Sequence, residues 1–252
     1  TVGIGDRIFI DMVGSDTDAV NVNTSTITVK STTYHAGISV TMTETGANTG
    51  IFRGFARVAN STETDDVFNF IGAANTNTIT VEKAPASVTT TVSTTALWRL
   101  ANSPESVERD LTIPAGSTLT IEPSVTATFV NTGTNLVING KLVADGALGT
   151  EITLTSGGTW DGLYMNTTAD ITSVIDYCII EKASYGIYLY KNLSVTNCTV
   201  RNNLNRGIYV YNCSPVINGC TIQNNTYENG IYVYFYDANV NGITITNNTI
   251  TG

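Results

Sequence analysis

Charge is scarce in this chain of 252 residues: 13% of the residues are charged, and the formal net charge is −9. No basic cluster occurs, which argues against binding to nucleic acid or to an anionic membrane surface. The chain has a single histidine, which argues against a zinc site built from cysteine and histidine. No apolar stretch approaches about 18 residues, so no membrane-spanning helix is predicted. In the first ninety residues no apolar stripe of helical period appears, which directs the prediction there to β-structure.

Polarity comes instead from Thr, Ser and Asn. That composition is typical of β-rich extracellular proteins rather than of cytosolic enzymes. The chain begins at Thr1 without Met, as expected after removal of a leader or an upstream domain. We therefore predict an extracellular or cell-surface location.

One pentapeptide occurs in three near-copies in the last third of the chain. The copies are Gly186–Tyr190, Gly207–Tyr211 and Gly230–Tyr234, with starts separated by 207−186 = 21 and 230−207 = 23 residues. A fixed period in this range indicates stacked units that bury their apolar faces only against one another. Within each copy, aliphatic residues alternate with two tyrosines, as in a strand with two different faces. The pattern predicts inward aliphatic ladders and two outward tyrosine columns, Tyr188–Tyr209–Tyr232 and Tyr190–Tyr211–Tyr234.

Other positions recur at the same period. A repeated corner, where Asn tolerates left-handed backbone, is predicted at Asn202-Asn203, Asn224-Asn225 and Asn247-Asn248. A second strand is predicted to begin at Cys178, Cys198, Cys220 and Ile243, and a third to carry Val174, Val195, Val216 and Val240. Three short strands in about 22 residues describe one coil of a parallel β-helix. Glu181 and Arg201 fall in the same outward position of successive coils, which predicts an exposed ion pair.

The earlier coils carry a family resemblance. Trp98 to Phe129, with Leu111–Ile113, Gly116 and Leu119–Pro123, resembles the opening coil of right-handed β-helix surface proteins, the pectin-lyase-like folds of archaeal and bacterial cell surfaces. Trp160–Tyr164 and Asp176–Glu181 resemble the coils that follow. The resemblance covers residues 97–252 and implies a right-handed parallel β-helix with room for six or seven coils at about 22 residues each.

Residues 1–86 lack this period. Six or seven short alternating runs separated by polar turns favour an antiparallel β-sandwich of immunoglobulin-like type. Thr43–Gly54 resembles a loop-and-strand motif of immunoglobulin-like repeats in prokaryotic surface and S-layer-type proteins. That family often places acidic residues in the loop around Asp16 and Asp18, which makes both candidate calcium ligands; the competing interpretation is a solvated turn. No other cofactor is predicted, and the Ser/Thr-rich residues 87–96 are predicted to be a linker.

No catalytic constellation is apparent. A glycosidase needs two carboxylates flanking one bond, and no two acids of the regular coils occupy the same or adjacent outward positions of one strand. These acids are Asp161, Asp170, Asp176, Glu181, Glu228 and Asp237. Four cysteines, at 178, 198, 213 and 220, lie within the predicted β-helix as buried thiols or as disulfides, and the parallel Cβ vectors of a ladder favour thiols. We expect no enzyme activity.

The outward tyrosines are the main functional candidates. They can stack on one another along the wall, form a lateral protein interface, or bind carbohydrate through their ring faces. The chain stops in mid-coil after Asn247, so we expect either that the polypeptide continues or that another subunit covers the last coil. The sequence predicts a non-enzymatic structural protein of an S-layer, sheath or filament, acting in self-assembly or adhesion. The alternative is a polysaccharide-binding module or a carbohydrate-active β-helix enzyme.

Asn-x-Ser/Thr sequons add the prediction of a glycoprotein. The candidate acceptors are Asn23, Asn60, Asn166, Asn192, Asn212 and Asn224. Because the chain is rich in Asn and Thr, many sequons are expected to arise by chance.

Overall fold

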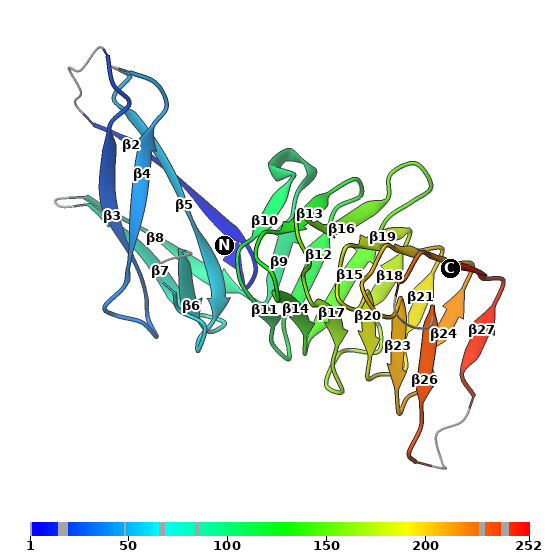
Figure 1. The fold of residues 1–252 in the computed structure, drawn as a ribbon. Coiled ribbons are helices and arrows are strands. Elements are labelled where there is room, and N and C mark those ends of the chain that lie inside the picture. Colours follow the sequence, from blue (N-terminus) through cyan, green and yellow to red (C-terminus); the bar gives the residue numbers. More distant parts are fainter. Residues whose placement is uncertain are drawn as a thin grey trace. The chain divides into compact units, whose positions relative to one another are not determined.

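The computed structural model describes residues 2–14, 20–47, 49–65, 69–83, 86–226, 230–237 and 242–252. The chain divides into two compact units, residues 1–96 and 97–252, each built from β-strands (Figure 1). The helix among the described residues is a single 3-10 turn, η1 (Leu100–Asn102). Within the described ranges, no helix has the length and apolarity needed to cross a membrane. The all-β prediction is confirmed.

Eight strands of the first unit join in one sheet. They are β1 (Val2–Gly3), β2 (Arg7–Val13), β3 (Thr24–Ser31), β4 (Ile38–Glu44), β5 (Ile51–Asn60), β6 (Phe70–Ala73), β7 (Thr78–Lys83) and β8 (Ala86–Ser93). The hydrogen-bonded order is β1-β8-β7-β3-β4-β5-β2, and β6 pairs in parallel with β5. Because β5 pairs with both β4 and β2, the strands stay in a single mixed sheet. The two-sheet immunoglobulin-like sandwich therefore stays a prediction.

The core of this unit follows from strand alternation. Along β4, buried and exposed residues alternate without exception, which places Ile38, Val40 and Met42 on the inner face. Val29 of β3 and Val58 of β5 are fully buried in the same cluster. A single sheet that hides one face in this way must curl around its own apolar side chains.

The structure corrects the predicted linker at residues 87–96. Residues 86–93 form β8, which pairs antiparallel with β7 from Lys83–Ala86 to Thr78–Thr91. The next strand, β9 (Thr95–Trp98), already belongs to a sheet of the β-helix. The Thr and Val residues here are β-branched and suit a strand. The sequence suggested a linker because most residues here are Ser or Thr without an apolar pattern. In the structure most of their side chains are exposed, and Val92 and Ala96 are buried.

The second unit is a parallel β-helix of three sheets. The first sheet contains β9 (Thr95–Trp98), β12 (Thr118–Ile121), β15 (Lys141–Asp145), β18 (Val174–Asp176), β21 (Ser194–Thr196), β24 (Val216–Asn218) and β27 (Thr244–Thr246). The second contains β10 (Glu105–Val107), β13 (Thr126–Phe129), β16 (Ile152–Ser156), β19 (Cys178–Glu181), β22 (Thr199–Arg201), β25 (Thr221–Gln223) and β28 (Thr249–Thr251). The third contains β11 (Leu111–Ile113), β14 (Asn135–Ile138), β17 (Gly162–Met165), β20 (Ile187–Leu189), β23 (Ile208–Tyr211) and β26 (Ile231–Tyr234). Sheets of seven, seven and six strands agree with the six or seven coils expected.

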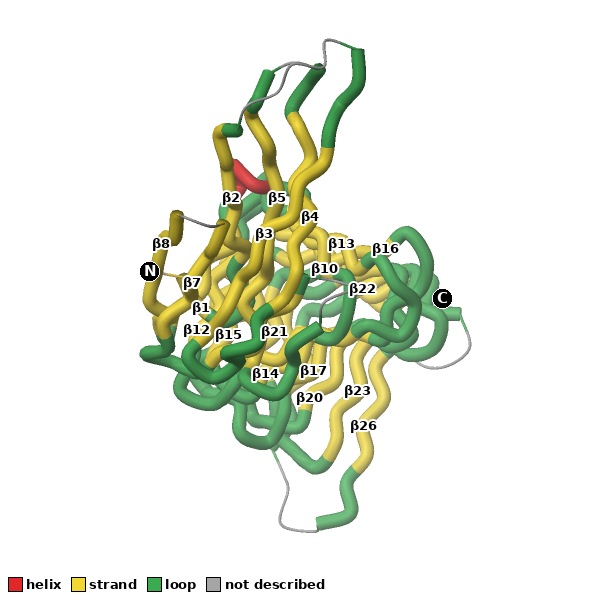
Figure 2. The backbone as a smooth tube through the Cα atoms, turned by 90° about the vertical axis from the view of Figure 1, so that its left-hand side faces the viewer, coloured by secondary structure: helices red, strands yellow, loops and turns green. Residues whose placement is uncertain are grey.

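Like residues stack on like in the third sheet, whose strands run side by side in Figures 1 and 2. The register pairs Leu163 with Ile187, Ile187 with Ile208, and Ile208 with Ile231. Leu163, Ile187 and Ile208 are fully buried. Each coil therefore covers the apolar side chains of the one before it, which accounts for the repeat in the sequence.

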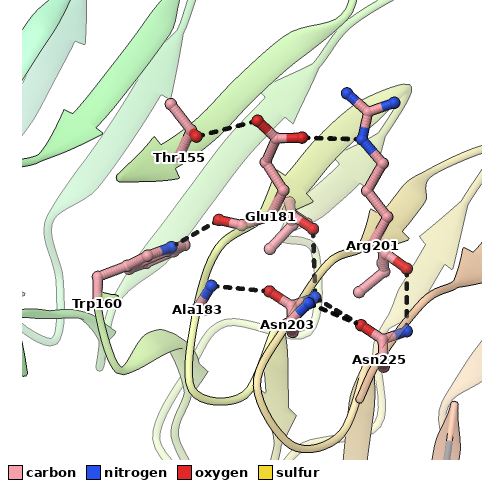
Figure 3. Close-up of polar contacts among 9 residues, drawn as sticks. Thr155, Trp160, Glu181, Ala183, Arg201, Asn203 and Asn225 are labelled. Atoms are coloured by element: carbon pink, nitrogen blue, oxygen red, sulfur yellow. Dashed lines mark hydrogen bonds and ion pairs between the residues drawn. The ribbon is translucent and has the colours of Figure 1, made fainter. Parts of the chain in front are cut away.

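A ladder of asparagines fixes the corner that follows the second sheet (Figure 3). Asn202 and Asn224 each have φ of 55°, the left-handed conformation that Asn tolerates. The next residues, Asn203 and Asn225, are buried. Asn203 Oδ1 accepts a hydrogen bond from the Ala183 amide at 2.9 Å, and Asn203 Nδ2 donates to Asn225 Oδ1 at 3.0 Å. The buried side-chain amides thereby satisfy backbone groups at the turn.

In the last coil, the strand that joins the second sheet is not the predicted one. The register pairs β28 with β25, so Thr249 and not Thr244 follows Thr221 in the second sheet. The spacing there is 249−221 = 28 residues, against 221−199 = 22 one coil earlier. Asn248 bonds to the amide of Cys220, so it takes the place predicted for Ile243, and Asn247-Asn248 lie at a different corner from Asn202-Asn203. A longer connection after β26 breaks the fixed period.

The valine column predicted for the first sheet mixes the two faces of its strands. Val174 pairs with Ser194, and Ser194 pairs with Val216, while the inward position is held by Ile175, Val195 and Ile217. A shift of one residue moves a side chain to the other face of a strand, and Val216 is accordingly 38% exposed. Val240, assigned to the same column, lies outside the described residues.

Candidate functional site

The outer surface of the third sheet carries a concentration of aromatic rings. On β20 and β23 the aliphatic residues are buried and the tyrosines between them are half-buried on the other side. We call this surface the tyrosine face. Its described members are Tyr164, Tyr185, Tyr188, Tyr190, Tyr209, Tyr211, Tyr232, Tyr234 and Tyr236.

The first column runs along four successive coils. Tyr164 and Tyr188 stack with ring centroids 4.1 Å apart. Tyr188 meets Tyr209 edge to face at 5.4 Å, and Tyr209 stacks on Tyr232 at 5.6 Å. Offset-stacked and edge-to-face pairs at these distances are favourable beyond the apolar area that they bury. The column starts one coil earlier than the sequence repeat indicated, because Tyr164 follows Gly162-Leu163 where the later copies have Gly-Ile.

The second column lies beside the first. Tyr190, Tyr211 and Tyr234 follow one another with centroid separations of 5.5 Å each. Tyr236 extends this group, 5.8 Å from Tyr211. The two columns also touch, since the rings of Tyr209 and Tyr211 are 6.1 Å apart. The structure thus brings together all six tyrosines that the sequence singled out, and whether they bind anything stays a prediction.

Arg206 joins the tyrosine face, which sequence reasoning did not foresee. Its guanidinium lies 3.9 Å from the ring centroid of Tyr232, 5.3 Å from that of Tyr209 and 5.7 Å from that of Tyr185. A cation over aromatic faces is attracted by the ring quadrupole. The available signal was positional: Tyr185 and Arg206 both precede the Gly of a repeat copy, so they occupy equivalent places on successive coils.

The rings stay uncharged over a wide pH range. Burial raises the pKa of Tyr188, and its hydrogen bond to Tyr164 raises it further. Burial also raises the pKa of Tyr164, Tyr190 and Tyr209. At neutral pH the described part of the tyrosine face therefore offers hydroxyl groups and ring faces, with Arg206 as a positive charge among them.

Exposure increases toward the last coils. Tyr188 and Tyr209 are half-buried by their neighbours, whereas Tyr234 is 43% exposed and Tyr236 is 67% exposed. Phe235 between them is 38% exposed. Self-stacking therefore accounts for the inner rings, and the outer rings are available for contact with another molecule.

The last coil also exposes its ladder residues. Ile245 of β27 pairs in register with the fully buried Ile217, yet it is 41% exposed. Ile250 of β28 likewise follows the fully buried Ile222 and is 51% exposed. β26, β27 and β28 are each the last strand of their sheet. Together they form what we call the open end, which presents strand edges and apolar ladder positions at once.

The predicted ion pair is formed, but it is less exposed than expected. Arg201 Nε donates to Glu181 Oε2 at 2.8 Å, and Thr155 donates to Glu181 Oε1 at 3.0 Å (Figure 3). The side chain of Glu181 is only 12% exposed. Its backbone oxygen also accepts a hydrogen bond from Trp160 Nε1 at 2.9 Å. These contacts tie neighbouring coils together.

The remaining candidates are scattered. Asp16 and Asp18 lie outside the described residues, and within the described ranges no group of three or more acidic, Cys or His side chains could hold a metal ion. Among the sequon asparagines, Asn192 and Asn224 are exposed, and Asn23, Asn60, Asn166 and Asn212 are half-buried. Asn166 already donates its side-chain amide to Asn139. The four cysteines are buried thiols.

Comparison with known proteins agrees with the coil geometry. The family model described as "Right handed beta helix region" matches residues 112–252, which is more than half of the chain. No curated protein and no solved structure matches the chain. The match supplies the handedness of the coils. On the strength of its stacked coils and of this match, the chain belongs to the right-handed β-helix family.

Proposed function

We propose that this chain is a non-enzymatic structural protein of the cell surface or extracellular space, a subunit of an S-layer, sheath or filament. It assembles through the end and the tyrosine face of its β-helix. The observation that carries this proposal is the tyrosine face, where the rings of Tyr234 and Tyr236 stay exposed beside the half-buried Tyr211. At the open end, a coil in the next position, supplied by the same polypeptide or by a neighbouring subunit, would bury Ile245 and Ile250.

The tyrosine face supports a lateral contact. Tyr234, Phe235 and Tyr236 are consecutive and all exposed, and the rings of Tyr234 and Tyr236 both lie against that of Tyr211. Tyrosine and arginine are enriched in protein interfaces, where a ring gives a large contact area at low entropic cost. Arg206 adds a charge that is already held in place by the rings around it.

Two acids of the coils, Glu181 and Asp176, are held in structural contacts, which supports a role without catalysis. Glu181 accepts hydrogen bonds from Arg201 and Thr155. Asp176 Oδ1 accepts from Thr196 at 2.7 Å and from Asn197 at 2.9 Å. We further infer that the first unit is an immunoglobulin-like domain of S-layer type, which the resemblance of Thr43–Gly54 supports.

Sedimentation velocity tests assembly through the open end. The wild-type chain should form larger species as its concentration rises, and the double variant Ile245→Lys, Ile250→Lys should sediment as a monomer because two charges would face the next coil. Leu148→Lys with Ile171→Lys is the matched control, since these residues are 84% and 64% exposed and lie in turns between strands. A folded wild-type chain that stays monomeric at every concentration would overturn the proposal.

Polysaccharide binding is the second candidate. It is favoured by the row of exposed rings around Tyr234 and Tyr236, because sugar faces stack on aromatic rings. Affinity electrophoresis in gels containing a polysaccharide would show retarded migration of the wild-type chain and normal migration of Tyr234→Ser, Tyr236→Ser. If both proteins migrate alike over a panel of polysaccharides, this candidate is rejected.

A further inference from the structure

The rings of the tyrosine face form one connected network along four coils. β17, β20, β23 and β26 lie side by side (Figure 2), and each of them carries at least one ring. From Tyr164 the ring contacts run to Tyr188, then to Tyr209 and then to Tyr232, with centroids 4.1, 5.4 and 5.6 Å apart. Rings at these separations are in van der Waals contact. The network therefore reaches from β17 to β26 without a gap.

A second route runs through the other column. Tyr188 lies 6.1 Å from Tyr190 on the same strand, and Tyr190 lies 5.5 Å from Tyr211 on the next strand, again between ring centroids. Tyr211 in turn lies 6.1 Å from Tyr209. Among the described residues, Tyr209 and Tyr211 are therefore the two rings through which the coil of β20 reaches the coil of β26.

The layer beneath the rings is aliphatic. Along β20 and β23 the residues that alternate with the tyrosines are fully buried, and they are Ile187, Leu189, Ile208 and Val210. A phenol gives up an electron far more readily than a saturated side chain does. An oxidation that reaches a ring of β20 or β23 therefore moves among the rings and not into this layer.

Tyr164 and Tyr188 are joined by a hydrogen bond as well as by stacking. Burial raises the pKa of both hydroxyls, and the bond between them acts to raise the pKa of Tyr188 further and to lower that of Tyr164. A bond that favours the neutral form of one phenol and the anionic form of the other has the first phenol as its donor. Tyr188 thus donates to Tyr164, so a path for a proton lies beside the path for an electron.

We propose that the tyrosine face relays one-electron oxidation along the β-helix, from ring to ring between β17 and β26. The substrate class is the peroxyl radical, an oxidant that takes a hydrogen atom from phenols. The phenolic O–H bond of a tyrosine breaks and an O–H bond forms on the peroxyl oxygen, so the products are a hydroperoxide and a tyrosyl radical. The relay operates within one molecule and does not depend on assembly.

Each step of the relay exchanges a radical and a phenol. When Tyr164 is the radical, the hydroxyl proton of Tyr188 crosses their hydrogen bond while an electron passes between the stacked rings. Tyr164 becomes a phenol again, and Tyr188 becomes the radical. Between Tyr209 and Tyr232 the electron passes through the ring contact and the proton through water, because both side chains are only partly buried. A hydrogen-atom donor of the enediol class in solution ends the sequence by restoring the last phenol.

A light-driven oxidant attached beside Tyr164 tests the relay on the full chain. Thr167 is exposed and lies two residues after the end of β17, so Thr167→Cys can carry a ruthenium(II) polypyridyl label there. The four native thiols are buried, which leaves the new cysteine as the reactive one. Quenching of the excited label by a cobalt(III) ammine gives ruthenium(III), which takes one electron from a nearby ring while the phenolic proton passes to water. A nitroso spin trap marks the tyrosyl radicals, and peptide mass spectrometry locates the adducts.

We expect adducts at Tyr164 and also at Tyr232, three coils further along. The double variant Tyr209→Phe, Tyr211→Phe keeps both rings for packing but removes the phenols that connect the coils. In this variant the adduct at Tyr232 should be lost, and the adduct at Tyr164 should stay.

The matched control removes two phenols that lie outside the tyrosine face. Tyr34 belongs to the first unit, and Tyr177 follows β18 of the first sheet. Tyr34→Phe with Tyr177→Phe should therefore leave the adduct at Tyr232 unchanged. Circular dichroism melting shows that all variants are folded. The relay is rejected if the chain with Tyr209 and Tyr211 intact carries no adduct at Tyr232, or if their replacement leaves that adduct in place.

Protein concentration separates transfer within one molecule from transfer between molecules. The yield at Tyr232 relative to that at Tyr164 should not change on dilution, whatever the chain's state of assembly. A ratio that rises with concentration would show transfer between molecules and would contradict the proposal.

An azo compound that releases peroxyl radicals on warming tests the substrate class. With the unlabelled wild-type chain, spin-trap adducts should form on the tyrosine face, and hydroperoxide should accumulate in step with them. Hydroperoxide that does not exceed the level formed without protein would exclude the peroxyl radical as substrate and contradict the proposal.

Discussion

The side-chain amide nitrogen of Asn203 lies 3.0 Å from Oδ1 of Asn225, the equivalent residue one coil further on. The same oxygen of Asn225 accepts the backbone amide of Asn203 at 3.2 Å. One side chain therefore serves two donors of the neighbouring coil, at a position that water does not reach. The spacing of the coils at this corner is held by side chains as well as by the strands.

Substituting Asn203 by Ala should lower the free energy of unfolding by about 1–3 kcal/mol, because the Ala183 amide loses its acceptor inside the protein. Asn202 next to it has φ of 55° and is exposed, so Asn202→Gly should change stability by less than about 0.5 kcal/mol. Urea unfolding measures both. Equal losses in the two variants would contradict the assignment of separate roles to the two residues.

Replacing Glu181 by Gln should destabilise the chain by about 1 kcal/mol at neutral pH. Burial acts to raise the pKa of Glu181, but hydrogen bonds from Arg201 and Thr155 and the charge of Arg201 outweigh it, so the pKa lies below its ordinary value. A carboxylate whose pKa is lower in the folded state stabilises the fold above its unfolded pKa. That contribution is lost as the pH falls through the folded pKa.

The difference between wild type and Glu181→Gln should therefore shrink as the pH is lowered, and vanish below the folded pKa of Glu181. Urea unfolding at a series of pH values checks this. Glu151→Gln serves as the comparison: backbone hydrogen bonds lower the pKa of Glu151 too, but they lie in an exposed turn, so its pH-dependent difference should be smaller than that of Glu181. A difference at Glu181 that is the same at every pH would show that the charge is not involved.

The cysteines should be unreactive in the folded protein. Burial raises the pKa of Cys213 to about 11 and raises that of Cys198 well above its ordinary value. At pH 8 only about one in a thousand Cys213 thiols would be ionised, and the thiolate is the reactive form. A thiol reagent should find no reactive group in the native chain and all four after denaturation. Rapid labelling of the native chain would contradict the buried ladder.

Tyr188 and Tyr236 should differ sharply in their effect on stability. Tyr188 contacts the rings of Tyr164, Tyr185, Tyr190 and Tyr209, so Tyr188→Ala should cost about 2 kcal/mol. Tyr236 is 67% exposed, and Tyr236→Ala should cost less than about 0.5 kcal/mol. Thermal unfolding measures both. Equal effects would mean that the inner rings do not stabilise one another.

The repeat allowed much of the β-helix to be predicted from residues such as Ile187, Ile208 and Tyr209, because a ladder needs the same residue type at the same place in each coil. The strands of the last coil were predicted wrongly because the repeat is no longer regular there. The chain between Tyr234 and Thr244 is longer than its counterparts, so counting at a fixed period put Ile243 on the wrong strand. The inward residues of the first sheet were predicted wrongly for a related reason. Adjacent apolar residues such as Val174 and Ile175 do not show which of the two points inward.

Tertiary contacts that join residues distant in sequence could not be read from any pattern. Trp160 stacks on Phe129 inside the helix with ring centroids 4.0 Å apart, and nothing in the local sequence pairs them. Arg206 is placed over Tyr232 by coil stacking alone. The sequence of β8 is rich in Ser and Thr and resembles a linker; it becomes a strand only through its pairing with β7.

Fibre diffraction from the concentrated chain tests most directly the proposal that one molecule continues the coils of the next. End-to-end stacking predicts ordered filaments with a reflection at about 4.8 Å along the filament axis, because the strands of successive coils and of successive molecules share that spacing. Isolated particles of one folded chain at every concentration, with no filaments and no such reflection, would contradict it.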